Sequence, residues 1–160
     1  MKRLPYIWLM LLLTACSSID CPVNSIVETI YKVYDGEGNE LVLSDSLTVT
    51  SVRKDGQDVV LNRLTGKSTF NLPISYSHPE DVFYFHFSNT TDSLLVTDTV
   101  WIKKDDYPHF ESVDCNSIFF HTLTGIRYTH HYIDSIVIKN PSVTYDYETV
   151  HLYLYPKSNH

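Results

Sequence analysis

The sequence predicts an all-β protein, and more narrowly an antiparallel β-sandwich, immunoglobulin-like or related, of about seven to nine strands. Short runs rich in β-branched and aromatic residues recur roughly every 8–12 residues. Turn-forming clusters such as 35–39 (DGEGN), 54–58 (KDGQD) and 65–67 (TGK) separate them. No long segment has the 3.6-residue periodicity of an amphipathic helix.

Each run has its own reason to be a strand. Residues 26–34 (IVETIYKVY) alternate apolar and polar side chains, as a half-buried strand does, and end at the turn 35–39. Residues 59–64 and 68–72 flank the three-residue turn 65–67, which is typical of a hairpin. The remaining expected strands are 41–43, 46–52, 82–87 (VFYFHF), 93–102, 107–113, 117–128, 133–138 and 150–155.

Length and charge narrow the classes of function. A chain of 160 residues forms one domain, and 43% apolar residues argue against intrinsic disorder. The formal net charge of −7 argues against a nucleic-acid partner, which requires clustered Lys and Arg.

The N-terminus has the features of an export signal. Lys2 and Arg3 precede ten residues of mostly apolar character at 4–13, too few to cross a bilayer, which takes about 20. Residues 13–16 (LTAC) resemble the lipobox of bacterial lipoproteins. This resemblance implies cleavage before Cys16 and attachment of fatty acyl chains such as palmitate to Cys16, with an ordinary cleaved signal peptide as the alternative. At least two acyl chains give stable membrane attachment.

These features predict a signal peptide at 1–15, a lipidated N-terminus and short tether at 16–24, and a single sandwich domain at 25–160. Residue 17 is Ser and not the Asp of an inner-membrane retention signal, so we expect a lipid-anchored protein of the outer membrane. Whether it faces the periplasm or the surface stays open.

Two further cysteines, Cys21 and Cys115, remain once Cys16 is acylated. An even pair in an exported protein favours a disulfide, which would contribute about 4–5 kcal/mol for so long a loop. Free thiols or a metal site are the alternatives.

The C-terminal half resembles an uncharacterised family of small Bacteroidota envelope lipoproteins, a domain of unknown function. The segments that carry the resemblance are 107–115 (YPHFESVDC), 129–138 (THHYIDSIVI) and 150–155 (VHLYLY). The family also has a second cysteine soon after its lipobox, as at Cys21. The resemblance implies an envelope location and a fold but no activity.

In Bacteroidota, Asp-Ser/Thr-apolar triplets are O-glycosylation sites. Four such triplets place candidate acceptors at Ser46, Ser93, Thr99 and Ser135. The alternative is that an Asp-Ser/Thr turn followed by an apolar residue is simply how these strands begin.

No pattern predicts catalysis, so we expect no enzyme, no cofactor and no metal. The eight His include the adjacent pair His130 and His131, which on a strand face opposite sides, while His121 and His130 could pair across a hairpin. There is no Gly-x-Ser-x-Gly elbow and no phosphate-binding loop. The oxygen-rich segment 35–39 is interpreted as a turn and not a calcium loop.

Tyrosine is frequent, with 12 residues. Tyr145 and Tyr147, and likewise Tyr153 and Tyr155, lie two apart, so each pair would share one face of a strand and could form an aromatic binding face for sugar or peptide. The alternative is that tyrosine suits half-buried strands.

The sequence therefore predicts a membrane-anchored, non-catalytic envelope lipoprotein that binds a protein, peptide or glycan or serves as a structural accessory. A small envelope hydrolase and a fimbria-like assembly subunit are the alternatives.

Overall fold

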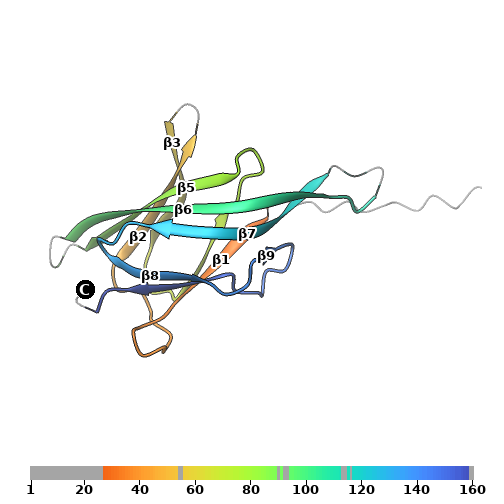
Figure 1. Ribbon diagram of the computed structural model, residues 1–160. Helices are drawn as coiled ribbons and strands as arrows, with labels where there is room; N and C mark the ends of the chain where they lie inside the picture. The colour runs from red at the N-terminus through yellow and green to blue at the C-terminus, as the bar shows by residue number, and fades with distance from the viewer. Residues whose placement is uncertain are drawn as a thin grey trace, which may run out of the picture.

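The computed structural model describes residues 27–53, 56–89, 91, 94–112, 115 and 117–158. This part of the chain forms ten β-strands in two sheets and contains no helix (Figure 1). The predicted all-β sandwich is therefore confirmed, with slightly more strands than expected. The described residues also contain no helix long and apolar enough to cross a bilayer.

The smaller sheet has four strands in the order β4-β1-β10-β8. Their bounds are β1 Glu28–Val33, β4 Thr69–Pro73, β8 Ile133–Ile138 and β10 Leu152–Pro156. β1 and β10 run parallel, and the other neighbours run antiparallel. A purely antiparallel sandwich was predicted, and the parallel β1–β10 pair corrects this. The last strand returns through a crossover and lies beside the first strand, running in the same direction.

The larger sheet has six strands in the order β3-β2-β5-β6-β7-β9, and every neighbouring pair is antiparallel. Their bounds are β2 Ser46–Arg53, β3 Gly56–Leu64, β5 Glu80–Asn89, β6 Leu94–His109, β7 Ile118–Tyr128 and β9 Ser142–Val143.

Three sequence-based expectations about the strands were wrong. The turn 65–67 does not close a hairpin, because β3 belongs to the large sheet and β4 to the small one. Leu43, expected within a strand, lies in a loop and exchanges backbone hydrogen bonds of 2.8 and 3.0 Å with this turn. The expected strands 93–102 and 107–113 are largely one strand, β6, whose register shift between Lys103 and Lys104 lets pairing with β7 continue.

Alternation in β5 explains how the two sheets enclose the core. Phe83, Phe85 and Phe87 point inward and are buried, whereas the intervening side chains are half-buried on the other face. The Phe85 ring lies 5.9 Å from Tyr31 of the small sheet. Burial of each such ring contributes roughly 1.5–3 kcal/mol, so these contacts between the sheets account for much of the core's stability.

A buried carboxylate, Asp98, holds the segment that carries the chain from β7 in the large sheet to β8 in the small one. Amide groups in such a crossing have no strand to pair with, and burying them unpaired would be costly. Asp98 of β6 is fully buried and accepts their hydrogen bonds. The donors are Thr129 Oγ1 at 2.6 Å and the amides of His131 at 2.7 Å, Tyr132 at 2.8 Å and Ile133 at 2.8 Å.

A second buried carboxylate, Asp45, extends this network. The Tyr132 hydroxyl donates to Asp45 Oδ2 at 2.8 Å, and Asn89 Nδ2 donates to Asp45 Oδ1 at 2.6 Å. The Tyr132 ring stacks on Phe87 with the ring centres 3.8 Å apart. The crossing is therefore held to the large sheet through its backbone, its hydroxyl and its ring.

Ionisation of Asp98 is favoured despite its burial. Desolvation acts to raise the pKa of the carboxyl, but the hydrogen bonds from Thr129 and from the three amides outweigh it, so the pKa of Asp98 lies below its usual value. The folded state consequently binds its proton less tightly than the unfolded chain does.

We predict that Asp98→Asn lowers the free energy of unfolding by about 2–4 kcal/mol, because an amide cannot accept all the hydrogen bonds that the carboxylate accepts. Urea denaturation at neutral pH followed by circular dichroism measures this loss.

The matched control is Asp105→Asn, an exposed position on the same strand, which should change stability little.

Because the pKa of Asp98 is lowered on folding, its contribution is present above about pH 4 and disappears as the pH falls through the folded-state pKa. The wild type and D98N should therefore converge in acid, and a difference that is independent of pH would contradict this assignment.

Candidate functional site

Three tyrosines meet on the outward face of the small sheet. Tyr153 and Tyr155 of β10 point outward, as their spacing predicts, and the structure adds Tyr34, which directly follows β1. The Tyr34 ring lies 4.7 Å from Tyr153 and 6.1 Å from Tyr155 between ring centres. We call these three residues the tyrosine face.

Parallel pairing of β1 with β10 creates this face. Val33 pairs with Leu154, and both side chains point into the core and are fully buried. Their neighbours therefore point outward together, and Lys32 lies opposite Tyr153. The partner of Tyr34 in β10 is far away in the sequence, so sequence spacing alone could not have revealed it.

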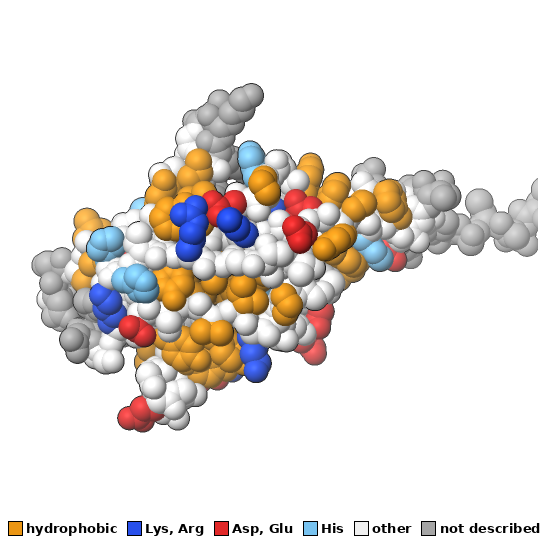
Figure 2. All heavy atoms as spheres, viewed as in Figure 1, with side chains coloured by type: hydrophobic (Ala, Val, Ile, Leu, Met, Phe, Trp, Pro, Cys, Tyr) orange, Lys and Arg blue, Asp and Glu red, His pale blue; other side chains and the backbone are white. Residues whose placement is uncertain are grey.

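Cationic and aliphatic groups border the tyrosine face. Lys32 Nζ lies 5.7 Å from the centre of the Tyr34 ring, and Lys139 Nζ lies 5.8 Å from that of Tyr153. Val137 of β8 pairs with Tyr153 and is exposed. Figure 2 shows hydrophobic side chains gathered below β8 and β10, with a basic side chain beside them.

Two hollows adjoin the tyrosine face at the end of the sheet where β1 and β10 finish. One has a volume of about 460 Å³ and is lined by Gly36, Asp134, Ser135, Tyr155 and residues 156–158. The other, of about 510 Å³, lies between the 156–158 segment and the loop after β1, with Tyr132 also on its wall. The tyrosine face thus borders recesses that are lined by carboxylate, hydroxyl and ammonium groups.

The loop that borders both hollows is an internally bonded turn, as the sequence predicts. Asp35 Oδ1 accepts the amides of Glu37 and Asn39 at 2.9 and 2.8 Å, and Gly38 takes a positive φ of 85°. Hydrogen bonds from Asn39 hold the pKa of Asp35 below its usual value. The oxygens of Asp35 therefore shape the turn.

Tyr145 and Tyr147 do not join the tyrosine face, and the prediction that they share a strand face was wrong. They lie in the loop after β9. Asp146 between them accepts the amides of Glu148 at 2.8 Å and Thr149 at 3.2 Å, and this side-chain turn replaces strand geometry. Tyr145 packs against Phe120, whereas Tyr147 is exposed.

The candidate glycosylation triplets divide by the role of their aspartate. In two of them the aspartates are the buried Asp45 and Asp98, and the acceptors Ser46 and Thr99 are half-buried within strands. In the third, Asp134 is exposed and Ser135 lines the first hollow. Two of the triplets thus arise from a structural need for buried carboxylates.

Some predicted site residues lie outside the described part of the chain. Cys16, Cys21 and Ser93 are among them, as is the whole signal peptide. Cys115 is described and is half-buried between β6 and β7, so the pairing of Cys21 with Cys115 stays a prediction.

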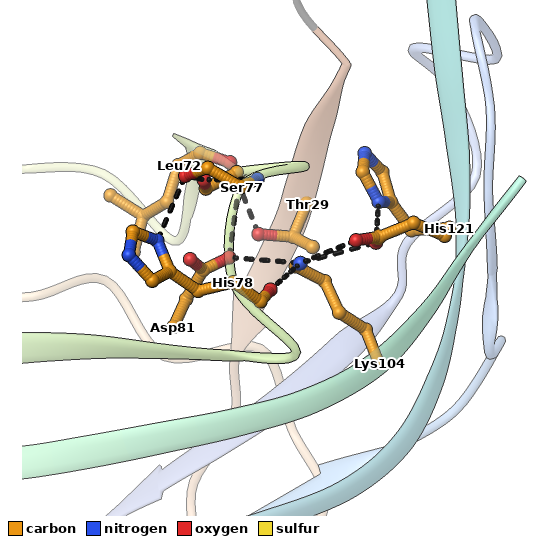
Figure 3. Close-up of polar contacts among 9 residues, drawn as sticks. Thr29, Leu72, Ser77, His78, Asp81, Lys104 and His121 are labelled. Atoms are coloured by element: carbon orange, nitrogen blue, oxygen red, sulfur yellow. Dashed lines mark hydrogen bonds and ion pairs between the residues drawn. The ribbon is translucent and has the colours of Figure 1, made fainter. Parts of the chain in front are cut away.

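A second buried polar cluster lies at the opposite end of the sandwich from the two hollows. Figure 3 shows its residues His78, Asp81, Lys104 and His121. Lys104 of β6 has a fully buried side chain, and its ammonium group donates to the His78 carbonyl at 2.6 Å and to Asp106 Oδ1 at 3.1 Å. It also lies 3.9 Å from Asp81 Oδ2. His121 Nδ1 lies 2.6 Å from Asp106 Oδ1. We call these residues the lysine cluster.

Burial shifts two pKa values in the lysine cluster. Desolvation raises the pKa of Asp81, opposed by the Ser75 amide and by Lys104. Desolvation also lowers the pKa of His121, although Asp106 favours its charged form. The sequence suggested His121 only as a partner of His130 across a hairpin. His130 instead contacts the Asp134 carbonyl at 3.0 Å, near the other end of β7.

Residues 46–156 match the model of a family of unknown function, DUF6452. The chain belongs to this family. The DUF6452 match begins at the first residue of β2 and ends at the last residue of β10, so β1 lies outside it. β1 nevertheless sits between β4 and β10, so the folded unit of this DUF6452 protein includes a strand that the family match omits. No curated protein and no solved structure matches the chain.

We predict that Lys104→Met lowers the free energy of unfolding by about 2–4 kcal/mol, because Asp81 and Asp106 then lose the cation between them while remaining largely shielded from water. Chemical denaturation at pH 7 measures the change.

Lys103→Met is the matched control, since the neighbouring Lys103 is exposed. Its stability should stay within about 0.5 kcal/mol of wild type. Equal effects of the two substitutions would show that the buried ammonium group has no special role.

Proposed function

We propose that this protein is a lipid-anchored, non-catalytic module of the bacterial cell envelope that binds a glycan on the tyrosine face. The juxtaposition of Tyr34, Tyr153 and Tyr155 with the hollow lined by Asp134, Ser135 and Lys157 is the observation that carries the proposal.

The chemistry of this surface suits a saccharide. A sugar ring presents C–H groups that pack on flat aromatic rings and hydroxyl groups that need hydrogen-bonding partners at its edge. The tyrosine rings offer flat surfaces on which the C–H groups can pack. The adjoining hollow offers hydrogen-bond donors and acceptors for the hydroxyl groups. A peptide ligand would use the same rings, and the experiment below separates the two.

The arrangement of charged groups supports a binding role over hydrolysis. A hydrolase would be expected to present perturbed carboxyl and imidazole groups in a cavity open to substrate. The shifted pKa values of Asp81 and His121 belong to the lysine cluster, whose Lys104 side chain is fully buried. The lowered pKa of Asp35, which lines the second hollow, comes from the hydrogen bonds that hold its own turn. The hollows described above lie at the other end of the strands.

The β3 edge of the large sheet does not favour strand addition by an assembly partner. β3 is an edge strand, but its pairing with β2 shifts register twice, and Arg63 within it has a positive φ of 49°. Irregular, twisted edges of this kind protect proteins against edge-to-edge pairing.

We predict that Tyr153→Ala and Tyr155→Ala each weaken glycan binding about tenfold or more, which corresponds to about 1.4 kcal/mol of lost contact energy. The probes are isolated peptidoglycan sacculi and an array of bacterial polysaccharides, screened with the mature protein.

Tyr147→Ala is the control, because Tyr147 is an exposed tyrosine that lies away from the tyrosine face. It should bind like the wild type. Binding that Y153A and Y155A both leave intact would overturn the assignment of this face, and binding to a peptide array in place of the glycans would overturn the ligand class.

We predict that Cys16→Ala abolishes incorporation of radiolabelled palmitate and releases the protein from the membrane fraction, because Cys16 is the residue proposed to carry the acyl chains.

Cys21→Ala is the matched control and should retain the label. In the same preparations, mass spectrometry of unreduced wild-type protein should find the peptides of Cys21 and Cys115 joined. Unchanged labelling and fractionation of C16A would refute the anchor.

A further inference from the structure

Three large aromatic side chains are exposed at the end of the molecule where the lysine cluster lies. Tyr76, Tyr107 and Phe110 are 66%, 51% and 64% exposed. Tyr107 and Phe110 lie at or just after the end of β6, in the β6–β7 arm that extends beyond the rest of the sandwich (Figure 1). The Tyr76 ring stacks on Phe119 of the same arm, 4.8 Å apart. We call Tyr76, Tyr107 and Phe110 the aromatic tip.

The described chain starts at this same end. The Val27 carbonyl accepts a hydrogen bond of 3.3 Å from the Ile74 amide, two residues before Tyr76. Cys16, the proposed lipid-bearing residue, precedes Val27 by 11 residues. Even fully extended, such a segment reaches about 40 Å, so the anchor lies within that distance of Val27.

Cys115 strengthens this connection, because it follows Phe110 within the arm. If Cys21 pairs with Cys115 as predicted, the arm is joined directly to Cys21. Cys21 lies only five residues after Cys16. The full extension of this segment is about 18 Å, which is less than the thickness of a bilayer. The acyl chains would then enter the membrane beside the aromatic tip.

We infer that the aromatic tip lies in the interfacial layer of the membrane that holds the lipid anchor, an inference that rests on the anchor proposed above. Aromatic side chains are favoured at the boundary between headgroups and acyl chains. Asp105 and Glu111 beside the tip are acidic, so the attraction must come from the rings and not from charge.

This orientation directs the tyrosine face away from the bilayer. β1 runs from Val27, which bonds to Ile74 near Tyr76 of the tip, toward Tyr34, and β10 runs parallel to it toward Tyr155. The hollows at the far ends of these strands would therefore open toward the aqueous side of the envelope.

The experiment uses the full lipidated protein reconstituted into phosphatidylethanolamine–phosphatidylglycerol vesicles. Trp101→Phe removes the tryptophan of the predicted mature chain, since Trp8 lies within the signal peptide. Phe110→Trp then places a single probe at the tip. The matched control, Leu95→Trp in the same background, lies 80% exposed at the other end of β6.

Phospholipids brominated on their acyl chains should quench the emission of F110W roughly twofold or more, and that of L95W far less, because only the tip reaches the interface. Denaturation curves of both variants check that they remain folded.

Vesicle-bound protein whose F110W emission is unquenched, or quenched no more than that of L95W, would overturn the inference and leave the anchor standing. Protein that fails to float with the vesicles would instead overturn the anchor, and the membrane contact with it.

Discussion

The hydrogen bonds that Asp98 accepts from the crossing between β7 and β8 are the constraint on which the sandwich depends. This crossing moves the chain from one sheet to the other, and its amides find neither a strand partner nor free access to water. A carboxylate on an inward-facing position of β6 satisfies several of them at once. Asp45 then secures Tyr132 of the same crossing. The position of β8, and through it of β10, follows from this attachment.

The sandwich thus carries ionised groups at both ends of its interior and apolar side chains between them. At one end Asp98 and Asp45 are satisfied by amide, hydroxyl and side-chain amide donors. At the other, Lys104 balances two carboxylates and caps a backbone carbonyl. Each arrangement offsets the desolvation of its charges with specific partners. Such partners fix how the sheets are placed, which an apolar core alone specifies less sharply.

Parallel pairing of the first and last strands determines which features lie at each end of the small sheet. It brings Tyr34 beside Tyr153 and Tyr155 at one end, while the chain leading back toward Cys16 leaves from the other. The proposed ligand-binding end and the proposed membrane end are consequently opposed along the same strands. The proposed glycan site and the proposed membrane contact therefore do not compete for surface.

What the sequence alone determined is local and periodic. A period of two placed Tyr153 and Tyr155 on one face of a strand, because side-chain alternation in a strand needs no knowledge of its neighbours. The structure shows the same alternation in β5, where Phe83, Phe85 and Phe87 share the buried face. The same rule failed at Tyr145 and Tyr147, where Asp146 bends the backbone. The triplets also drew attention to Asp45 and Asp98, but not to their role as acceptors, since the amides that bond to Asp98 lie more than 30 residues further along the chain. Sheet membership, the parallel β1–β10 pair, the tyrosine face and the lysine cluster were decided by the tertiary structure, because each depends on which distant segments the crossings bring together.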